Sequence, residues 1–148
     1  MKKILFICTG NTCRSVMAEA LGRLWLKENG LEDVEISSAG LAALPNMSAA
    51  PQAAEVMQKR GLNVENHSSK LLDVSVIEEA EIVFVMTHAH LDQLLTYYPE
   101  AEAKVKLISK NDIPDPFGGT VEEYEKCALQ LEEAINKALQ EWTSSGRN

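Results

Sequence analysis

The chain has 148 residues, a length suited to one compact domain, and its 45% hydrophobic and 24% charged content is ordinary for a globular protein. Its formal net charge of -8 argues against a nucleic-acid partner, and no apolar run is long enough to cross a bilayer. The run ILFIC after the basic N-terminus is too short for a secretory signal, and the three cysteines are an odd number, which does not suit a disulfide framework. We therefore expect one monomeric, cytoplasmic domain over residues 1–148, with no nucleic-acid or membrane partner.

Short apolar runs alternate with amphipathic stretches along the chain. In chain order the pattern predicts a strand at 2–8, a helix at 15–30, a strand at 34–40, helices at 51–61 and 75–80, a strand at 81–87, a helix at 88–98, a strand at 103–108, a loop at 111–119 and a helix at 121–142. Ser15 is the expected N-cap of the first helix. His88 and His90 open a later helix and are expected to cap it or to face solvent.

Strands that alternate with helices predict a three-layer α/β/α domain around a four-stranded parallel sheet. Such sheets bind ligands beyond the carboxyl ends of their strands, where the strand order reverses. The polar loop between the first strand and the first helix lies at one of these ends. We therefore examine this loop first as a candidate site.

The loop CTGNTCRS, residues 8–15, combines a nucleophile with groups that bind an oxyanion. Free backbone N–H groups gather where a helix begins, and Gly10 lets the backbone approach a ligand closely. Arg14 adds a planar fork suited to two phosphate oxygens. The same donors stabilise a thiolate at Cys8, to which Ser15 can donate its hydroxyl. The alternative is that Cys8 is an inert cysteine at a buried strand end.

This loop, the following MAEA, SSAG at 37–40 and DPFGG at 115–119 together resemble the low-molecular-weight protein tyrosine phosphatase family, over essentially the whole chain. The resemblance implies that Cys8 forms a phosphocysteine intermediate, that Arg14 binds the phosphoryl oxygens and that Asp115 is the general acid and base. It implies phosphorylated protein substrates, with no metal and no cofactor. The other residues expected to bind phosphate or substrate are Thr9, Gly10, Asn11, Thr12, Cys13, Ser15 and Phe117, and the resemblance adds Ser38 and His67 as supports of Asn11. Val16 departs from the family, which usually has proline there, but no reacting group is lost.

The acidic residue of the second loop is open to two assignments. A leaving group departs more easily from phosphorus when a carboxylic acid protonates it, and Asp112 and Asp115 both lie in the loop NDIPDPFGG. Pro116 stiffens the backbone after Asp115, and Phe117 could wall the pocket. Without the cysteine loop, the same residues would be read simply as a turn.

Thr12 bears on the substrate. Family members that act on phosphotyrosine usually carry an apolar residue at this position, whereas a threonine resembles the bacterial protein arginine phosphatases. A hydroxyl can face the polar guanidinium of phosphoarginine, where an apolar wall would leave N–H groups unpaired. We therefore predict a protein-arginine phosphatase, with a protein-tyrosine phosphatase as the alternative.

Two further readings are less favoured. A thioredoxin-coupled arsenate reductase of similar fold needs additional relay cysteines, and residues 80–90 contain none, while Cys127 is alone in a helix where burial is expected. A phosphate-binding module could use the same loop but would not need Cys8 or Asp115. The neighbouring Cys13 also predicts a reversible Cys8–Cys13 disulfide after oxidation.

Overall fold

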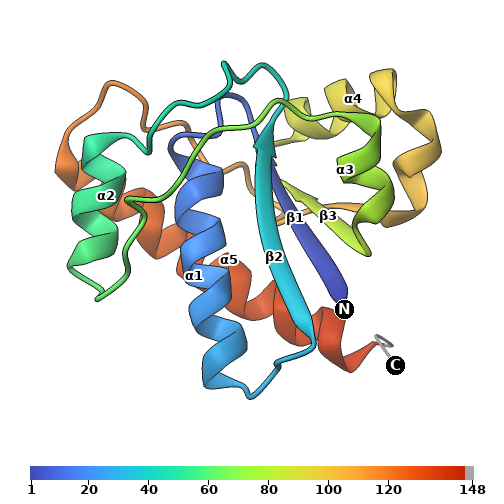
Figure 1. Cartoon of the computed structure of the whole chain (residues 1–148), viewed down its shortest axis with the longest axis horizontal. Coiled ribbons are helices and arrows are strands. Elements are labelled where there is room, and N and C mark those ends of the chain that lie inside the picture. The colour runs from blue at the N-terminus through green and yellow to red at the C-terminus, as the bar shows by residue number, and fades with distance from the viewer. Residues whose placement is uncertain (146–148) are drawn as a thin grey trace.

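Four parallel strands form the central sheet of the computed structural model, which describes residues 1–145 (Figure 1). The strands are β1 (Lys2–Cys8), β2 (Val34–Gly40), β3 (Ile82–Val85) and β4 (Val105–Leu107), in the order β2-β1-β3-β4. β1 pairs along its whole length with β2, from Lys2 opposite Val34 to Cys8 opposite Gly40. The predicted four-stranded parallel sheet is confirmed.

Alternation along β1 divides the hydrophobic core into two layers. Ile4 and Phe6 belong to one buried cluster, and Leu5 and Ile7 belong to the other. This follows from strand geometry, in which successive side chains point to opposite faces of the sheet. Both faces are covered, which explains why the run is continuously apolar.

Helices cover both faces, as Figure 1 shows. The helices α1 (Arg14–Glu28), α2 (Pro51–Gln58) and α5 (Val121–Ser144) lie on one face, and α3 (Val74–Glu79) and α4 (His88–Tyr97) lie on the other. The core-facing side of α5 includes the buried residues Ala128, Leu131 and Leu139, whereas Leu129 is 55% exposed. No helix among residues 1–145 is both long and apolar enough to span a membrane.

The predicted elements are confirmed in type and order, but α2 ends at Gln58 rather than at 61, and three other differences stand out. The N-cap of α1 is Cys13, and Ser15 lies inside the helix, where its side chain is used by the neighbouring loop. A 3-10 helix, η1 (Pro99–Lys104), precedes β4 and was not predicted. The strands β3 and β4 are shorter than their apolar runs. The predicted domain end at residue 148 lies outside the described residues.

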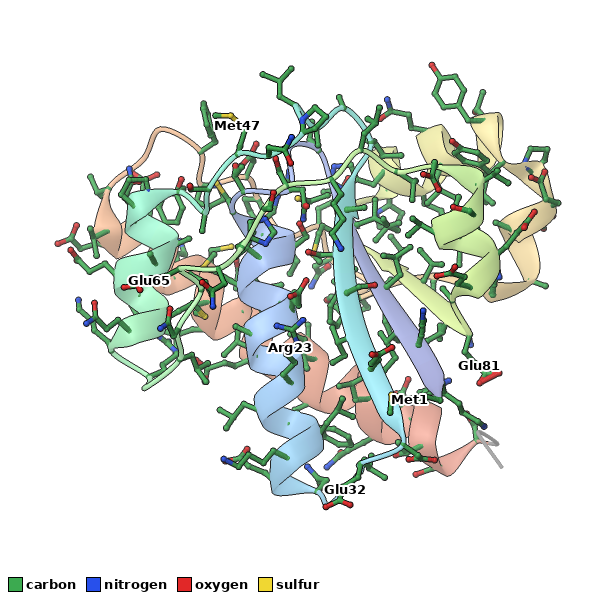
Figure 2. The ribbon with its side chains drawn as sticks, viewed as in Figure 1. Met1, Arg23, Glu32, Met47, Glu65 and Glu81 are labelled. Atoms are coloured by element: carbon green, nitrogen blue, oxygen red, sulfur yellow. The ribbon has the colours of Figure 1, made fainter. Side chains whose placement is uncertain are left out.

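The strand order reverses between β1 and β3. From β1 the chain moves outward to β2, then returns across the sheet to β3 and continues outward to β4. The loops that leave the carboxyl ends of β1 and β3 therefore diverge at this point, which leaves room for a ligand between them. Figure 2 shows Met47 at this end of the molecule, while Met1, Glu32 and Glu81 lie at the opposite end.

Candidate active site

Cys8 is the last residue of β1, and its side chain is held by the first turn of α1. The residue is only 2% exposed, and its Sγ lies 2.9 Å from Ser15 Oγ. A hydroxyl at this distance can donate to a thiolate. The residues between Cys8 and α1 form a short turn at the positive end of the helix, where backbone N–H groups favour an anion. We call residues 8–15 the phosphate loop.

Asn11 organises the middle of the phosphate loop. It has a φ of 57°, in the left-handed region that asparagine tolerates, and its side chain is fully buried. Its Nδ2 donates to Ser15 Oγ at 2.8 Å and to Ser38 Oγ at 2.9 Å, while its Oδ1 accepts from Lys70 N at 2.9 Å. His67 Nε2 lies 2.7 Å from the Asn11 carbonyl oxygen. Ser38 and His67, two residues far along the chain, therefore both contact Asn11.

Gly40 allows the end of β2 to lie directly against the phosphate loop. A Cβ atom at this position would stand 2.5 Å from the Thr9 carbonyl oxygen and 3.0 Å from the Asn11 nitrogen. Any side chain here would therefore displace the loop. This explains the glycine at the end of SSAG by close approach rather than by an unusual φ.

Arg14 joins the phosphate loop to the loop before α5. Arg14 is 5% exposed. Its Nη1 donates to the Ile113 carbonyl oxygen at 2.9 Å, and its Nη2 lies 3.6 Å from Asp115 Oδ2. Its Nε is a buried donor with no hydrogen-bond partner among the described residues. Arg14 therefore keeps a buried N–H group that can donate to a phosphoryl oxygen.

The structure distinguishes between the two candidate acids. Asp112 Oδ1 accepts from His88 N at 2.9 Å and lies 2.7 Å from His88 Nδ1, and these bonds lower the pKa of Asp112. Asp115 faces Arg14 instead, and its Oδ1 accepts from Phe117 N at 3.0 Å. Phe117 itself is 75% exposed, so its ring lies open on the surface of the same loop. Only Asp115 of the two contacts a residue of the phosphate loop.

His90 is a site residue that the sequence did not identify. It was expected to cap α4 or to face solvent, but Thr87 caps this helix and His90 is only 5% exposed. Its Nε2 lies 2.8 Å from Thr9 Oγ1 in the phosphate loop, and its Nδ1 has no partner among the described residues. Burial and the charge of Arg14 lower its pKa to about 4. One feature of the sequence could have indicated a site role for His90: it lies in the first turn after an apolar strand, at the end of the sheet where ligands bind.

The wall of the phosphate loop carries a hydroxyl beside a buried thiol. Thr12 is half-buried, and its Oγ1 lies 3.7 Å from Cys13 Sγ. Cys13 Sγ is 3.2 Å from the Tyr124 hydroxyl, and burial raises the pKa of the Cys13 thiol. Cys127 is buried as predicted, and desolvation raises its pKa to about 12, which does not suit a relay thiolate.

A metal site would need several ligating side chains close together. Within residues 1–145, no group of three or more His, Cys, Asp or Glu side chains is arranged to hold a metal ion. The donors gathered at the phosphate loop are instead those of an anion site: a guanidinium and hydroxyl groups at a helix N-terminus.

Comparison with known proteins places this site in a family context. A family model described as low molecular weight phosphotyrosine protein phosphatase matches residues 3–147. A protein-arginine-phosphatase of Bacillus subtilis (strain 168) is 37% identical over 140 residues, covering 90% of this chain and 92% of the relative. The low molecular weight protein-tyrosine-phosphatase Wzb of Salmonella typhi is 32% identical over 142 residues, covering 93% of this chain and 92% of the relative.

The fold comparison agrees with these relatives. A solved structure of the YwlE arginine phosphatase, in a cysteine-to-serine variant with a phosphorylated active-site serine, superposes with a TM-score of 0.92. It is 34% identical, and the match covers 98% of each chain. A low molecular weight protein tyrosine phosphatase from T. tengcongensis superposes with a TM-score of 0.90 at 35% identity, covering 95% of this chain and 99% of the other.

Proposed function

The chain belongs to the low molecular weight phosphotyrosine protein phosphatase family, and from this premise we propose that it is a protein-arginine phosphatase with Cys8 as nucleophile. The observation that carries the proposal is the pairing of two loops across the site. Arg14 of the phosphate loop lies 3.6 Å from Asp115 of the loop before α5. A nucleophile, an oxyanion-binding guanidinium and a carboxyl group thus meet at one edge of the sheet.

In the first step, the Cys8 thiolate attacks phosphorus and the bond from phosphorus to the leaving group breaks. Arg14 and the backbone N–H groups of the phosphate loop bind the equatorial oxygens, where charge accumulates. Asp115 donates its proton to the departing atom, which is a guanidino nitrogen for phosphoarginine. The arginine therefore leaves as a guanidinium cation, Asp115 is left as a carboxylate, and the enzyme holds a phosphocysteine.

In the second step, water attacks the phosphocysteine. Asp115, now a carboxylate, takes a proton from the water, the sulfur–phosphorus bond breaks, and Cys8 departs as a thiolate. Ser15 stabilises this thiolate through its hydroxyl, which lies 2.9 Å from the sulfur. Inorganic phosphate is released and Asp115 is again protonated. The phosphorylated active-site serine of the YwlE variant supports a covalent intermediate at the corresponding place.

Thr12 supports arginine as the substrate residue. Thr12 is a half-buried residue of the phosphate loop, and it offers a hydroxyl where an isoleucine would offer only carbon atoms. The guanidinium of phosphoarginine carries N–H donors that must stay hydrogen-bonded when they are buried, and each unpaired donor costs roughly 1–3 kcal/mol. Relatives from Bacillus subtilis and Geobacillus stearothermophilus that are named protein-arginine-phosphatase support the same choice.

A protein-tyrosine phosphatase is the second candidate function. It is favoured by the description of the matching family and by relatives such as Wzb, whose printed names carry tyrosine. The same nucleophile, guanidinium and acid serve both reactions, so only the wall of the pocket separates them. The exposed ring of Phe117, at the rim beside Asp115, is available to the substrate in either case.

Matched phosphopeptides test the proposal. We expect the wild-type protein to hydrolyse a phosphoarginine peptide with at least about tenfold higher kcat/KM than the phosphotyrosine peptide of the same sequence. Thr12→Ile should reduce this preference, and Cys8→Ser should abolish turnover of both peptides. A wild-type preference for phosphotyrosine would assign the second function. Phosphopeptide binding without turnover by the wild-type protein would instead indicate a binding module.

A further inference from the structure

The phosphate loop is held on both sides of Gly10, but by different parts of the chain. On one side, Asn11 is fixed by its buried side-chain hydrogen bonds to Ser15, Ser38 and Lys70. On the other side, Thr9 is held by the bond between its Oγ1 and His90 Nε2. Both sides must be fixed for the backbone N–H groups between them to converge on one anion.

Gly10 itself supplies no restraint. A Cβ built at this position would meet only Thr12 Oγ1, at 3.8 Å, so the surrounding space does not fix its conformation. Glycine also has the widest range of backbone conformations. The direction of the N–H groups next to Cys8 therefore depends on how firmly the flanking residue Thr9 is held.

Among the described residues, Thr9 makes two hydrogen bonds to partners outside the phosphate loop. Its carbonyl oxygen accepts from Ala42 N at 3.0 Å, and its hydroxyl is bonded to His90 at 2.8 Å. The first contact orients the peptide plane after Thr9. The second fixes the side chain, and through it the Cα position directly after the nucleophile.

His90 is itself rigidly placed. It lies in the first turn of α4, where its backbone N donates to Thr87 Oγ1 at 3.0 Å, and it is 5% exposed. The helix α4 follows β3, so the Thr9–His90 bond crosses the point where the strand order reverses. The pKa of about 4 keeps the imidazole neutral at ordinary assay pH.

We propose that His90 is a positioning residue of the phosphate loop, which holds Thr9 and with it the backbone donors beside Cys8 in the geometry that binds a phosphoryl group. The proposal rests on the proposed function only in assuming that this loop binds phosphate. It does not depend on whether the substrate residue is arginine or tyrosine. The effect of His90 is therefore expected to be equal for both substrates, unlike that of Thr12.

A double-mutant cycle tests the bond. Thr9→Val removes the hydroxyl and keeps the shape of the side chain, and His90→Phe removes the ring nitrogen. We expect each variant to lower kcat/KM for an aryl phosphate about 5–10-fold, and the double variant to lose no more than either single one. Inhibition by orthovanadate, which occupies the loop as a phosphoryl analogue, should weaken by a similar factor.

Two further variants separate positioning from folding. His90→Gln offers an amide near the place of Nε2 and should recover most of the lost kcat/KM. Asp73→Ala removes the N-cap of α3, where Asp73 Oδ1 accepts from Val76 N at 3.0 Å, and touches neither Thr9 nor His90; it should lower the Tm while kcat/KM stays within about twofold of wild type. If His90→Phe does not fold, Thr9→Val compared with Asp73→Ala still carries the test.

The proposal is overturned if the losses of the two single variants multiply in the double variant. It is equally overturned if Thr9→Val lowers only the Tm and leaves kcat/KM and vanadate inhibition unchanged. Failure of the proposed function has different signatures, because it appears as a wild-type preference for phosphotyrosine or as phosphopeptide binding without turnover. In the first case the cycle is still measured with the aryl phosphate, and in the second it is measured as the affinity for orthovanadate.

Discussion

Asn11→Ala removes the buried hydrogen-bonding centre of the phosphate loop. The change deletes three side-chain hydrogen bonds, to Ser15, Ser38 and the Lys70 backbone, at a position that is fully buried. At about 1 kcal/mol each, these bonds contribute about 3 kcal/mol to the free energy of unfolding. Alanine at a φ of 57° adds about 1 kcal/mol of backbone strain. We therefore expect a loss of about 4 kcal/mol.

Asn46→Ala is the matched control. Asn46 also has a left-handed backbone, with a φ of 67°, but it is exposed, and within residues 1–145 its side chain has one hydrogen bond, accepted by Oδ1 from Ser68 Oγ at 3.3 Å. This variant should lose only the strain, about 1 kcal/mol. The difference of about 3 kcal/mol between the two variants then measures the buried hydrogen bonds.

Urea unfolding at neutral pH, followed by circular dichroism, gives both values, and thermal scans should show Tm decreases of about 10 °C and about 3 °C. The Asn11 variant should also lose most of its kcat/KM because the loop amides are no longer aligned. If both variants lose the same free energy, the buried bonds contribute nothing and the reasoning is refuted.

Three other predictions concern single residues. Asp115→Asn should lower kcat about 10²-fold or more, with the largest loss for poor leaving groups, because the departing atom is no longer protonated. Asp112→Asn should change kcat only a few-fold. Kinetics with a series of aryl phosphates measures both effects. Hydrogen peroxide should convert the Cys8 thiolate to a sulfenic acid. The Cys13 thiol then displaces water from the sulfenic acid and forms a disulfide that reductant reverses, so reductant should not restore the activity of peroxide-treated Cys13→Ala. Because the folded state lowers the pKa of His90 from 6.5 to about 4, the unfolded chain binds more protons in this range. Stability should therefore decrease as pH falls below about 6.5, by about 2 kcal/mol at about pH 5, and His90→Gln should remove this decrease in urea unfolding.

Each of these predictions has an outcome that contradicts it. Equal losses in Asp115→Asn and Asp112→Asn would mean that the loop does not present Asp115 as the acid. Full recovery of Cys13→Ala by reductant would exclude the disulfide. An unchanged pH dependence in His90→Gln would mean that other groups cause the loss of stability at low pH.

The elements and the phosphate loop could be predicted from the sequence because their information is local. The run of residues 4–8 is apolar and buried at every position because both faces of the sheet are covered, and the nucleophile at its end and the guanidinium of Arg14 are separated by one short loop. The left-handed conformation at Asn11 is likewise a property of that residue and its neighbours. Local propensity and tertiary structure agree in these segments.

Tertiary structure decided the partners of these local features. Residue chemistry alone left Asp112 and Asp115 as alternatives, the family resemblance favoured Asp115, and the packing of their loop places Asp112 beside His88 and Asp115 beside Arg14. His90 was expected to cap its helix or face solvent, and it became a buried partner of Thr9 because β1 and β3 are adjacent and parallel. Parallel strands bring their carboxyl ends together from distant parts of the chain, so contacts between residues 9 and 90, or 14 and 115, depend on strand order. Hydrophobic periodicity carries no information on that order.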